Sequence, residues 1–183
     1  SQYFAGSVTK LLVASVVLQL VDEGELALDD TVDEYLDWPR DDEITVDQLL
    51  SHRSGMGDFG NDFGDDLREL VLADLGRRFT YAEVLDLVAD VPRVGEPGDA
   101  YHYTNANYIV LGAIVQAVTG GTLGAALDEH IIEPLGLDAT FYGPDDLDAL
   151  DGATFHGLFD VAGDGRPVDI GSFPRTAAFT VDP

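Results

Sequence analysis

Residues 6–10 read Gly-Ser-Val-Thr-Lys, and an almost wholly apolar run from Leu11 to Val21 follows them directly. The run is too short to span a bilayer, so it predicts a buried helix. Ser7 then falls in the first turn of that helix, and the i to i+3 spacing puts Ser7 and Lys10 on one face. The stretch therefore predicts a core helix that carries a hydroxyl and an amine side by side at its amino end.

The pairing of Ser7 with Lys10 is chemically suggestive. A serine hydroxyl is a poor nucleophile until a base takes its proton, and an amine one turn away can do so if burial lowers its pKa. The amide of Ser7, at a helix start, can also donate to a developing oxyanion. The alternative is a capping serine followed by a surface lysine. The chain holds six serines and one lysine, so chance alone gives this spacing only about 0.03 times per sequence.

A second polar motif, Tyr103-Thr104-Asn105, lies between a turn at residues 95–98 (Gly-Glu-Pro-Gly) and an apolar stretch, residues 108–118, that predicts a long core helix. A phenol beside a lysine cation has its ionisation favoured and can act as a general base. The amide of Asn105 can hold a substrate carbonyl or orient Lys10. The alternative is a core tyrosine and an N-cap asparagine.

The remaining elements are predicted from local signals. Three Thr-x-x-Glu/Gln capping boxes predict helix starts near Val32, Val46 and Tyr81. A further helix is expected from Leu123 to Ile132, ended by Pro134 and Gly136. Two short strands, Thr154 to Val161 and Pro167 to Ile170, are expected to join across Asp164-Gly165.

The composition bounds the function. The chain has 183 residues, enough for one domain, with 9 Lys and Arg against 35 Asp and Glu, a net charge of −26. This charge excludes nucleic-acid binding as the main function and disfavours anionic membranes. With 45% hydrophobic residues the chain should fold. The 26 Asp against 9 Glu, and 8 Arg against one Lys, predict a protein from concentrated salt; an ordinary acidic protein is the alternative.

The sequence predicts neither a metal nor another cofactor. There is no cysteine, and the four histidines are too scattered for a zinc site. Residues 55–60 match G-x-G-x-x-G only formally, because a capped helix rather than a strand precedes them. The acidic patch from Asp58 to Asp66 contains Asp62, Asp65 and Asp66, which we interpret as a solvated face. No secretory signal is recognisable, and compartment and oligomeric state remain open.

Taken together, the Ser7/Lys10 pair and the Tyr-Thr-Asn box resemble the serine β-lactamase and penicillin-binding-protein superfamily, most closely its class C-like branch, which includes esterases and D-amino-acid peptidases. Residues 49–56 (Leu-Leu-Ser-His-Arg-Ser-Gly-Met), 95–98 and 132–137 are similar to further segments of that family. The resemblance implies an α+β, β-lactamase/transpeptidase-like fold, of which this chain is mainly the helical part with few strands. It also implies that Ser7 attacks a carbonyl to form an acyl-enzyme, that Lys10 and Tyr103 move protons, and that Asn105 positions the substrate.

The family's third motif, Lys or His followed two residues later by Gly, does not occur in the sequence. The fold of the family also begins with strands upstream of the serine helix. We therefore expect residues 1–183 to be a partial catalytic domain, without the upstream strands and the C-terminal strands that carry the third motif. The expected partner is a small-molecule or peptide substrate: an ester, a β-lactam or a D-amino-acid amide. The alternatives are a ligand-binding module without turnover and a truncated, non-functional product.

Overall fold

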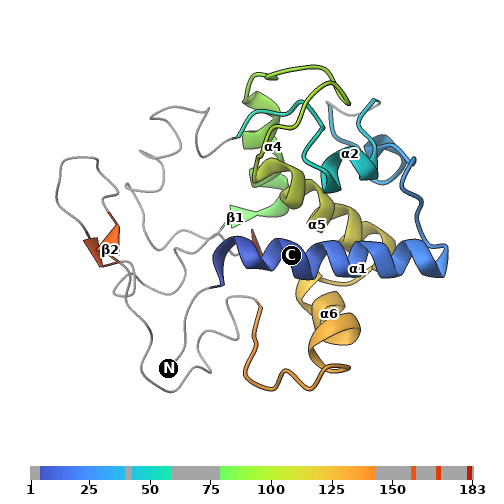
Figure 1. The fold of residues 1–183 in the computed structure, drawn as a ribbon, viewed down its shortest axis with the longest axis vertical. Helices are drawn as coiled ribbons and strands as arrows, with labels where there is room; N and C mark the ends of the chain where they lie inside the picture. Colours follow the sequence, from blue (N-terminus) through green and yellow to red (C-terminus); the bar gives the residue numbers. More distant parts are fainter. Residues whose placement is uncertain are drawn as a thin grey trace.

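A computed structural model describes residues 5–39, 43–58 and 79–142 of the chain, together with three strand pieces at 158–159, 168–169 and 181–182. The described part is mainly helical, as predicted (Figure 1). Its longer helices and short helical turns, in chain order, are η1 (Gly6–Val8), α1 (Thr9–Glu23), η2 (Val32–Glu34), α2 (Val46–Leu50), α4 (Tyr81–Asp90), α5 (Ala106–Thr119), α6 (Leu123–Leu127) and η3 (Asp128–Ile132).

The first helix forms where the apolar run predicts it, with two differences. Ser7 lies in the 3₁₀ turn η1, one turn ahead of α1, instead of inside the α-helix. The other difference is that α1 is buried on one face only, through Val13, Val16, Val17 and Leu20. The predicted burial thus holds for one face of the helix, because apolar residues recur around the whole helix but only one side packs against α5 and α6.

The three capping boxes are confirmed, and each helix begins at its predicted residue. In each box the threonine side chain and the third residue exchange hydrogen bonds with the backbone, which satisfies two amides of the first turn. The boxes are Thr31 with Glu34, Thr45 with Gln48, and Thr80 with Glu83. Only the first helix falls short, as the single 3₁₀ turn η2. A capping box therefore indicates where a helix starts but not how far it extends.

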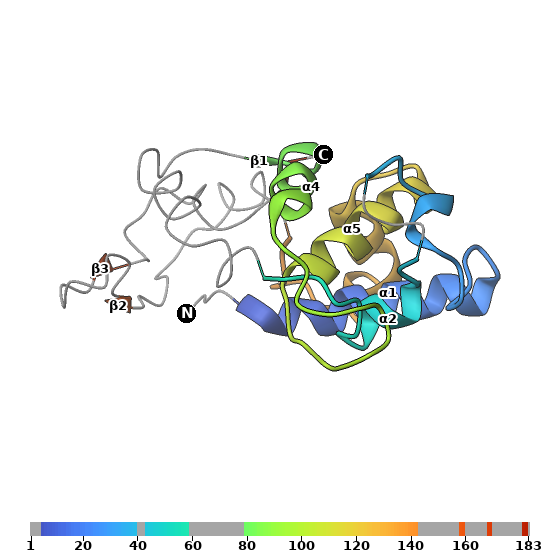
Figure 2. The same ribbon diagram turned by 90° about the horizontal axis from the view of Figure 1, so that it is seen from above.

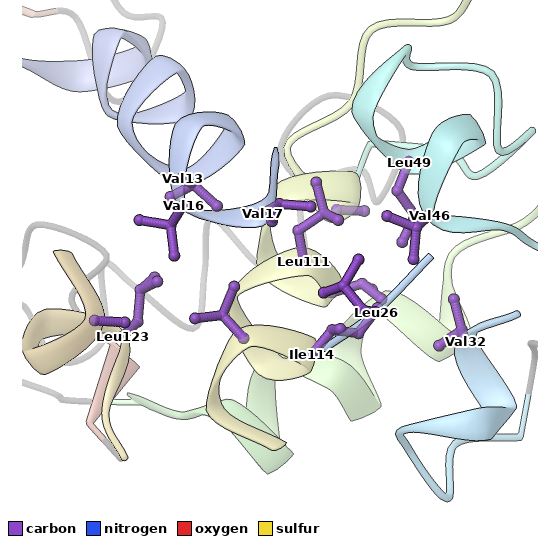
Figure 3. Packing of buried hydrophobic residues seen from close by; sticks show 14 of the residues in the cluster. Val13, Val16, Val17, Leu26, Val32, Val46, Leu49, Leu111, Ile114 and Leu123 are labelled. Atoms are coloured by element: carbon purple, nitrogen blue, oxygen red, sulfur yellow. The ribbon is translucent and has the colours of Figure 1, made fainter. Parts of the chain in front are cut away.

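The long helix α5 forms the centre of the core, as residues 108–118 predict, and ends at Gly120, which has a left-handed φ of 68°. It packs against α1, α2, α4 and α6. Figures 2 and 3 show α1 beside α5, with Val16, Val17, Leu111 and Ile114 in one apolar cluster. Such burial removes apolar area from water and stabilises the fold by about 1.5–3 kcal/mol per large side chain.

The helix predicted from Leu123 to Ile132 is present in two parts, the α-helical α6 and the π-helical η3. The two parts are continuous, so the predicted range is confirmed, but hydrogen-bond spacing widens in its second half. The amide of Glu133 donates to the carbonyl of Asp128 at 2.9 Å, five residues back. Nothing in the apolar periodicity signals such a widened turn.

Strands are few among the described residues. β2 (Leu158–Phe159) pairs antiparallel with β3 (Val168–Asp169), as expected of the predicted strands. The remainder of both predicted strands and the turn at Asp164-Gly165 lie outside the described residues. β1 (Phe79–Thr80) pairs in parallel with β4 (Val181–Asp182), a long-range pairing that no local signal predicts. The patch at Asp62, Asp65 and Asp66 also lies outside the described residues.

No single helix in the described ranges is long and apolar enough to cross a membrane. The segments Ala106–Thr119 and Leu123–Ile132 meet the length and composition criteria only as a pair bent by 83°.

Candidate active site

Three segments meet at the amino end of α1. They are residues 6–10, the loop of residues 51–58 that follows α2, and residues 101–107, which lead into α5. Because α5 packs against both α1 and α2, the starts of α1 and α5 and the end of α2 come together at one side of the core (Figure 2). Residues nearly one hundred positions apart in sequence thereby become neighbours.

The four residues singled out from the sequence lie within one hydrogen-bonded group. The Ser7 Oγ atom is 2.9 Å from the Tyr103 Oη atom. Lys10 Nζ donates to Ser7 Oγ at 3.2 Å and to Asn105 Oδ1 at 2.8 Å. We call Ser7, Lys10, Tyr103 and Asn105 the front cluster. The i to i+3 pairing of Ser7 and Lys10 holds, although Ser7 sits in the preceding 3₁₀ turn.

The front cluster is open to solvent. Ser7 is exposed, Tyr103 is 39% exposed, and Lys10 and Asn105 are half-buried. For the amine of Lys10 to act as the base by itself, the side chain would have to be desolvated. Among the described residues Lys10 is only half-buried. A substrate carbonyl can reach the serine hydroxyl from the surface.

The phenol of Tyr103 is electrostatically tuned. Burial by itself would raise the pKa of Tyr103, but its interactions with the Lys10 ammonium and the hydrogen bond with Ser7 outweigh burial and lower that pKa below the ordinary value of 10.0. Lys10 Nζ also lies 5.0 Å from the centre of the Tyr103 ring. A phenolate beside this ammonium can take the proton of Ser7 at a lower pH than free tyrosine can.

Neither of the structural alternatives for these residues describes their side chains. The hydroxyl of Ser7 caps no helix but bonds with Tyr103 and Lys10. Asn105 occupies the N-cap position of α5 without a side-chain cap bond. Thr104 serves the first turn instead, because its Oγ1 atom accepts the amide of Ala106 at 3.1 Å. The side-chain amide of Asn105 is thereby left to bond with Lys10.

Behind the front cluster lies a second group of polar side chains, all buried, which sequence reasoning missed as part of the site. His52 Nδ1 accepts the amide of Thr104 at 3.3 Å and bonds with Asn107 Nδ2 at 2.9 Å. Ser54 Oγ donates to Asn107 Oδ1 at 2.6 Å. We call His52, Ser54, Thr104 and Asn107 the back cluster. The one available signal was the family-like segment of residues 49–56, which contains His52 and Ser54.

His52 supports Tyr103 from behind. The two rings lie 4.5 Å apart between centroids, and the Tyr108 ring lies 5.3 Å from His52 on the α5 side. Burial lowers the pKa of His52 below 6.5, and the charges of Lys10 and His102 lower it further. The lowered pKa agrees with an Nδ1 atom that accepts hydrogen bonds. A proton on Nδ1 would prevent it from accepting those from Thr104 and Asn107.

Backbone hydrogen bonds join the 51–58 loop to residues 94–102. His102 N donates to the His52 carbonyl at 2.8 Å, and Val94 N donates to the Gly55 carbonyl at 2.9 Å. Gly55 has a left-handed φ of 73°, and a Cβ atom there would collide with the carbonyl oxygen of Gly95. Glycine is therefore required at this close approach, which aligns the Tyr-Thr-Asn box with the loop.

Asp58 is the other residue that sequence reasoning missed. The sequence places it in an acidic surface patch, yet its side chain is only 1% exposed and contacts Asn105. The available sequence signal was the family-like segment of residues 49–56, because Asp58 lies only two residues after its end.

Among the described residues no group of three or more His, Asp or Glu side chains could hold a metal ion.

Comparison with known proteins agrees with this site and fold. The Beta-lactamase family model matches residues 1–176. The chain is 33% identical over 187 residues to penicillin-binding protein 4 of Amycolatopsis lactamdurans, covering 97% of this chain and 45% of that protein. It is 37% identical over 150 residues to esterase EstB of Burkholderia gladioli, covering 72% and 36%.

Among solved structures, the D-stereospecific amidohydrolase from Streptomyces sp. superimposes with a TM-score of 0.77 at 26% identity, covering 92% of this chain and 52% of that one. The chain thus spans about half, or less, of the length of these relatives. The predicted β-lactamase/transpeptidase-like fold, of which the described residues are mainly the helical part, is confirmed by these matches. From its fold and from the match over residues 1–176, the chain belongs to the Beta-lactamase family.

Proposed function

We propose that the chain carries the nucleophile and proton-transfer groups of a serine hydrolase that works through an acyl-enzyme. The observation that carries the proposal is the position of Ser7 Oγ, 2.9 Å from the Tyr103 hydroxyl and 3.2 Å from Lys10 Nζ. A nucleophile within hydrogen-bond distance of a base, with that base oriented by a third group, is the arrangement that activates a serine. The names of the relatives, an esterase and a D-stereospecific amidohydrolase among them, support the same reaction class.

The proton-transfer roles follow from charge. Tyr103, with its lowered pKa, acts as the base that takes the Ser7 proton while Ser7 Oγ forms a bond to the substrate carbonyl carbon. The phenol then gives that proton to the departing alcohol or amine as the carbonyl–leaving-group bond breaks. Water attacks the acyl-enzyme by the reverse proton path, releasing the acid and restoring Ser7. Lys10 holds a positive charge next to the phenolate throughout.

Asn105 positions the reactants. Its Oδ1 atom accepts from Lys10 at 2.8 Å, and one of its two Nδ2 hydrogens points to Asp58. The second Nδ2 hydrogen is a suitable donor to a substrate carbonyl. The Ser7 amide, at the start of the helical segment, is a candidate donor to the oxyanion. The substrate class is an ester, a β-lactam or a D-amino-acid amide or peptide, all of which present a carbonyl carbon to the serine.

The proposal extends to the domain and its medium. Because the chain spans about half or less of its relatives' length, we assign residues 1–183 to part of a longer catalytic domain, in which further strands supply the third motif. The reading frame that encodes the chain is the direct check. The net charge of −26 further points to work in concentrated salt, where screening relieves self-repulsion. Activity is therefore expected in concentrated KCl.

The test is covalent labelling with a fluorophosphonate or a penicillin probe in concentrated KCl, located by mass spectrometry. The wild type should be labelled on Ser7, and Ser7→Ala should give no adduct, because it lacks the hydroxyl that forms the bond. Ser15→Ala is the matched control, since Ser15 is a serine on α1, the helix that follows Ser7, and its hydroxyl donates to the Leu11 carbonyl. Equal labelling of Ser7→Ala would reject the nucleophile. Binding of a probe without an adduct would instead indicate the ligand-binding module.

A further inference from the structure

A buried carboxylate lies directly behind Asn105. The side chain of Asp58 is 1% exposed, and its Oδ1 atom accepts the Asn105 backbone amide at 2.9 Å and Asn105 Nδ2 at 3.2 Å. The Thr104 hydroxyl lies 3.4 Å from the same oxygen and also donates to the Gly57 carbonyl at 2.9 Å. Burying a carboxylate is costly unless hydrogen bonds satisfy it, so these contacts define its place.

The contacts of Asp58 decide which way the Asn105 amide faces. An asparagine side chain has a donor end and an acceptor end, whereas an ionised carboxylate only accepts and an ammonium only donates. With Nδ2 toward Asp58, the Oδ1 atom faces Lys10 Nζ at 2.8 Å. The flipped amide would set an oxygen against the carboxylate and hydrogens against the ammonium. Both ends of the amide therefore favour one orientation.

Resting on the proposed function, we propose that Asp58 is a positioning residue: it locks the Asn105 amide so that Asn105 holds Lys10 beside Ser7 and Tyr103. Asp58 does not touch the reacting atoms. It acts through Asn105, whose Oδ1 atom accepts a hydrogen bond from the Lys10 ammonium, as Ser7 Oγ also does. The carboxylate also supplies a negative charge on the far side of Asn105 from the ammonium.

The first test reads the Asn105 amide directly and needs no activity. The chain has three asparagines and one lysine, so asparagine side-chain ¹⁵N labelling gives three amide pairs, and lysine ¹³Cε labelling gives one signal. The Asn105 pair is assigned by its loss in Asn105→Ser. In the wild type the Nδ2 hydrogen that points to Asp58 should exchange at least about tenfold more slowly than that of a free asparagine amide. Exchange at the free rate would overturn the proposal even without a variant.

The Asp58→Asn variant sharpens this test. It keeps the size of the side chain but removes the charge and the obligatory acceptor. We expect Asn105 amide exchange to quicken about tenfold and the Lys10 signal to move. Asp86→Asn is the matched control, because Asp86 is a carboxylate on α4, outside the site, and its loss changes the net charge equally. Unchanged Asn105 and Lys10 signals in folded Asp58→Asn would contradict the proposal.

The second test is the rate of Ser7 labelling. Asp58→Asn should lower it about 10- to 100-fold, because a small misplacement of a reacting group has effects of that size. Its pH profile should also shift to lower pH, since the charge of Asp58 raises the pKa of Tyr103. A purely structural role would lower the rate without moving the profile. The other titratable groups around Tyr103 are Lys10, His52, Tyr101, His102 and Tyr108, and none of them is substituted in this variant.

The two proposals fail in different ways. If the wild type shows Ser7-dependent labelling and Asp58→Asn matches it in rate and pH profile, the positioning role of Asp58 is overturned while the proposed function stands. If wild-type labelling does not depend on Ser7, the proposed function is overturned, and with it any part for Asp58 in acyl transfer.

Discussion

The front and back clusters are built from similar polar groups yet differ in burial. The front cluster, with Ser7 exposed and Tyr103 39% exposed, has its reactive atoms open to solvent. In the back cluster each side chain is at most 8% exposed. Exposed groups can meet a substrate, whereas buried, satisfied groups fix geometry. The comparison indicates that the exposed cluster carries the chemistry and the buried cluster fixes the alignment. The two clusters are in contact where the Tyr103 ring lies 4.5 Å from the His52 ring.

The largest expected effect is on the front cluster. Lys10→Arg should slow Ser7 labelling about 100-fold or more, because a misplacement of about 1 Å among the groups that align the nucleophile and its base has an effect of that size. The guanidinium is larger and planar and cannot fit both Ser7 Oγ and Asn105 Oδ1 as the compact ammonium does. Labelling rates and urea unfolding are measured together. Full activity in Lys10→Arg would break the distinction between the clusters, as would a large loss of stability.

The next effect concerns the loop of residues 51–58, which carries His52 and Ser54 of the back cluster. Gly55→Ala should lower the free energy of unfolding by at least about 2 kcal/mol, from left-handed strain and from the collision with the Gly95 carbonyl. Urea unfolding measures the change. Gly24→Ala is the control for φ alone, since Gly24 has a φ of 78° and a Cβ atom there would meet no described atom within 4 Å. Equal losses in both variants would mean that the close approach at Gly55 contributes nothing.

A smaller effect is expected from pH. In the folded chain the pKa of His52 is lowered below 6.5, mainly by burial and further by the charges of Lys10 and His102. As pH falls below about 6.5, the unfolded chain binds a proton that the folded chain does not, so stability falls until the folded pKa is reached. His52→Asn removes this contribution, and asparagine tolerates the left-handed φ of 56° found there. Denaturant unfolding gives the free energy of unfolding between about pH 5.5 and 7.5, and its slope against pH should be shallower for the variant than for the wild type. Equal slopes in the two proteins would contradict this role of His52.

The features that could be predicted from the sequence are those set by neighbours along the chain. The capping boxes at Thr31, Thr45 and Thr80 depend on three-residue spacing, and the Ser7/Lys10 pair depends on one helical turn. The Tyr103 and Asn105 motif is found by its resemblance to a family. Its contact with Ser7 becomes visible only once α5 packs against α1.

The features that could not be predicted are those set by packing between distant segments. Asp58 looks like the first residue of an acidic patch, but it is buried in the fold and contacts Asn105, which lies 47 positions away in the sequence. The open face of α1 and the turn before it, with Val8 58% and Leu11 68% exposed, likewise follows from which side packs. Apolar composition cannot distinguish the two faces when both are apolar.

The central claim is that Ser7 is activated by Tyr103 beside Lys10, and the rate of Ser7 labelling across pH tests it most directly. For the wild type we expect the rate to rise with pH through a midpoint below 10, because the phenolate is the active base and the pKa of Tyr103 is lowered from 10.0. In Tyr103→Phe the rate should fall at least about 100-fold and that rise should vanish. Equal rates and equal pH profiles in the two proteins would contradict the account.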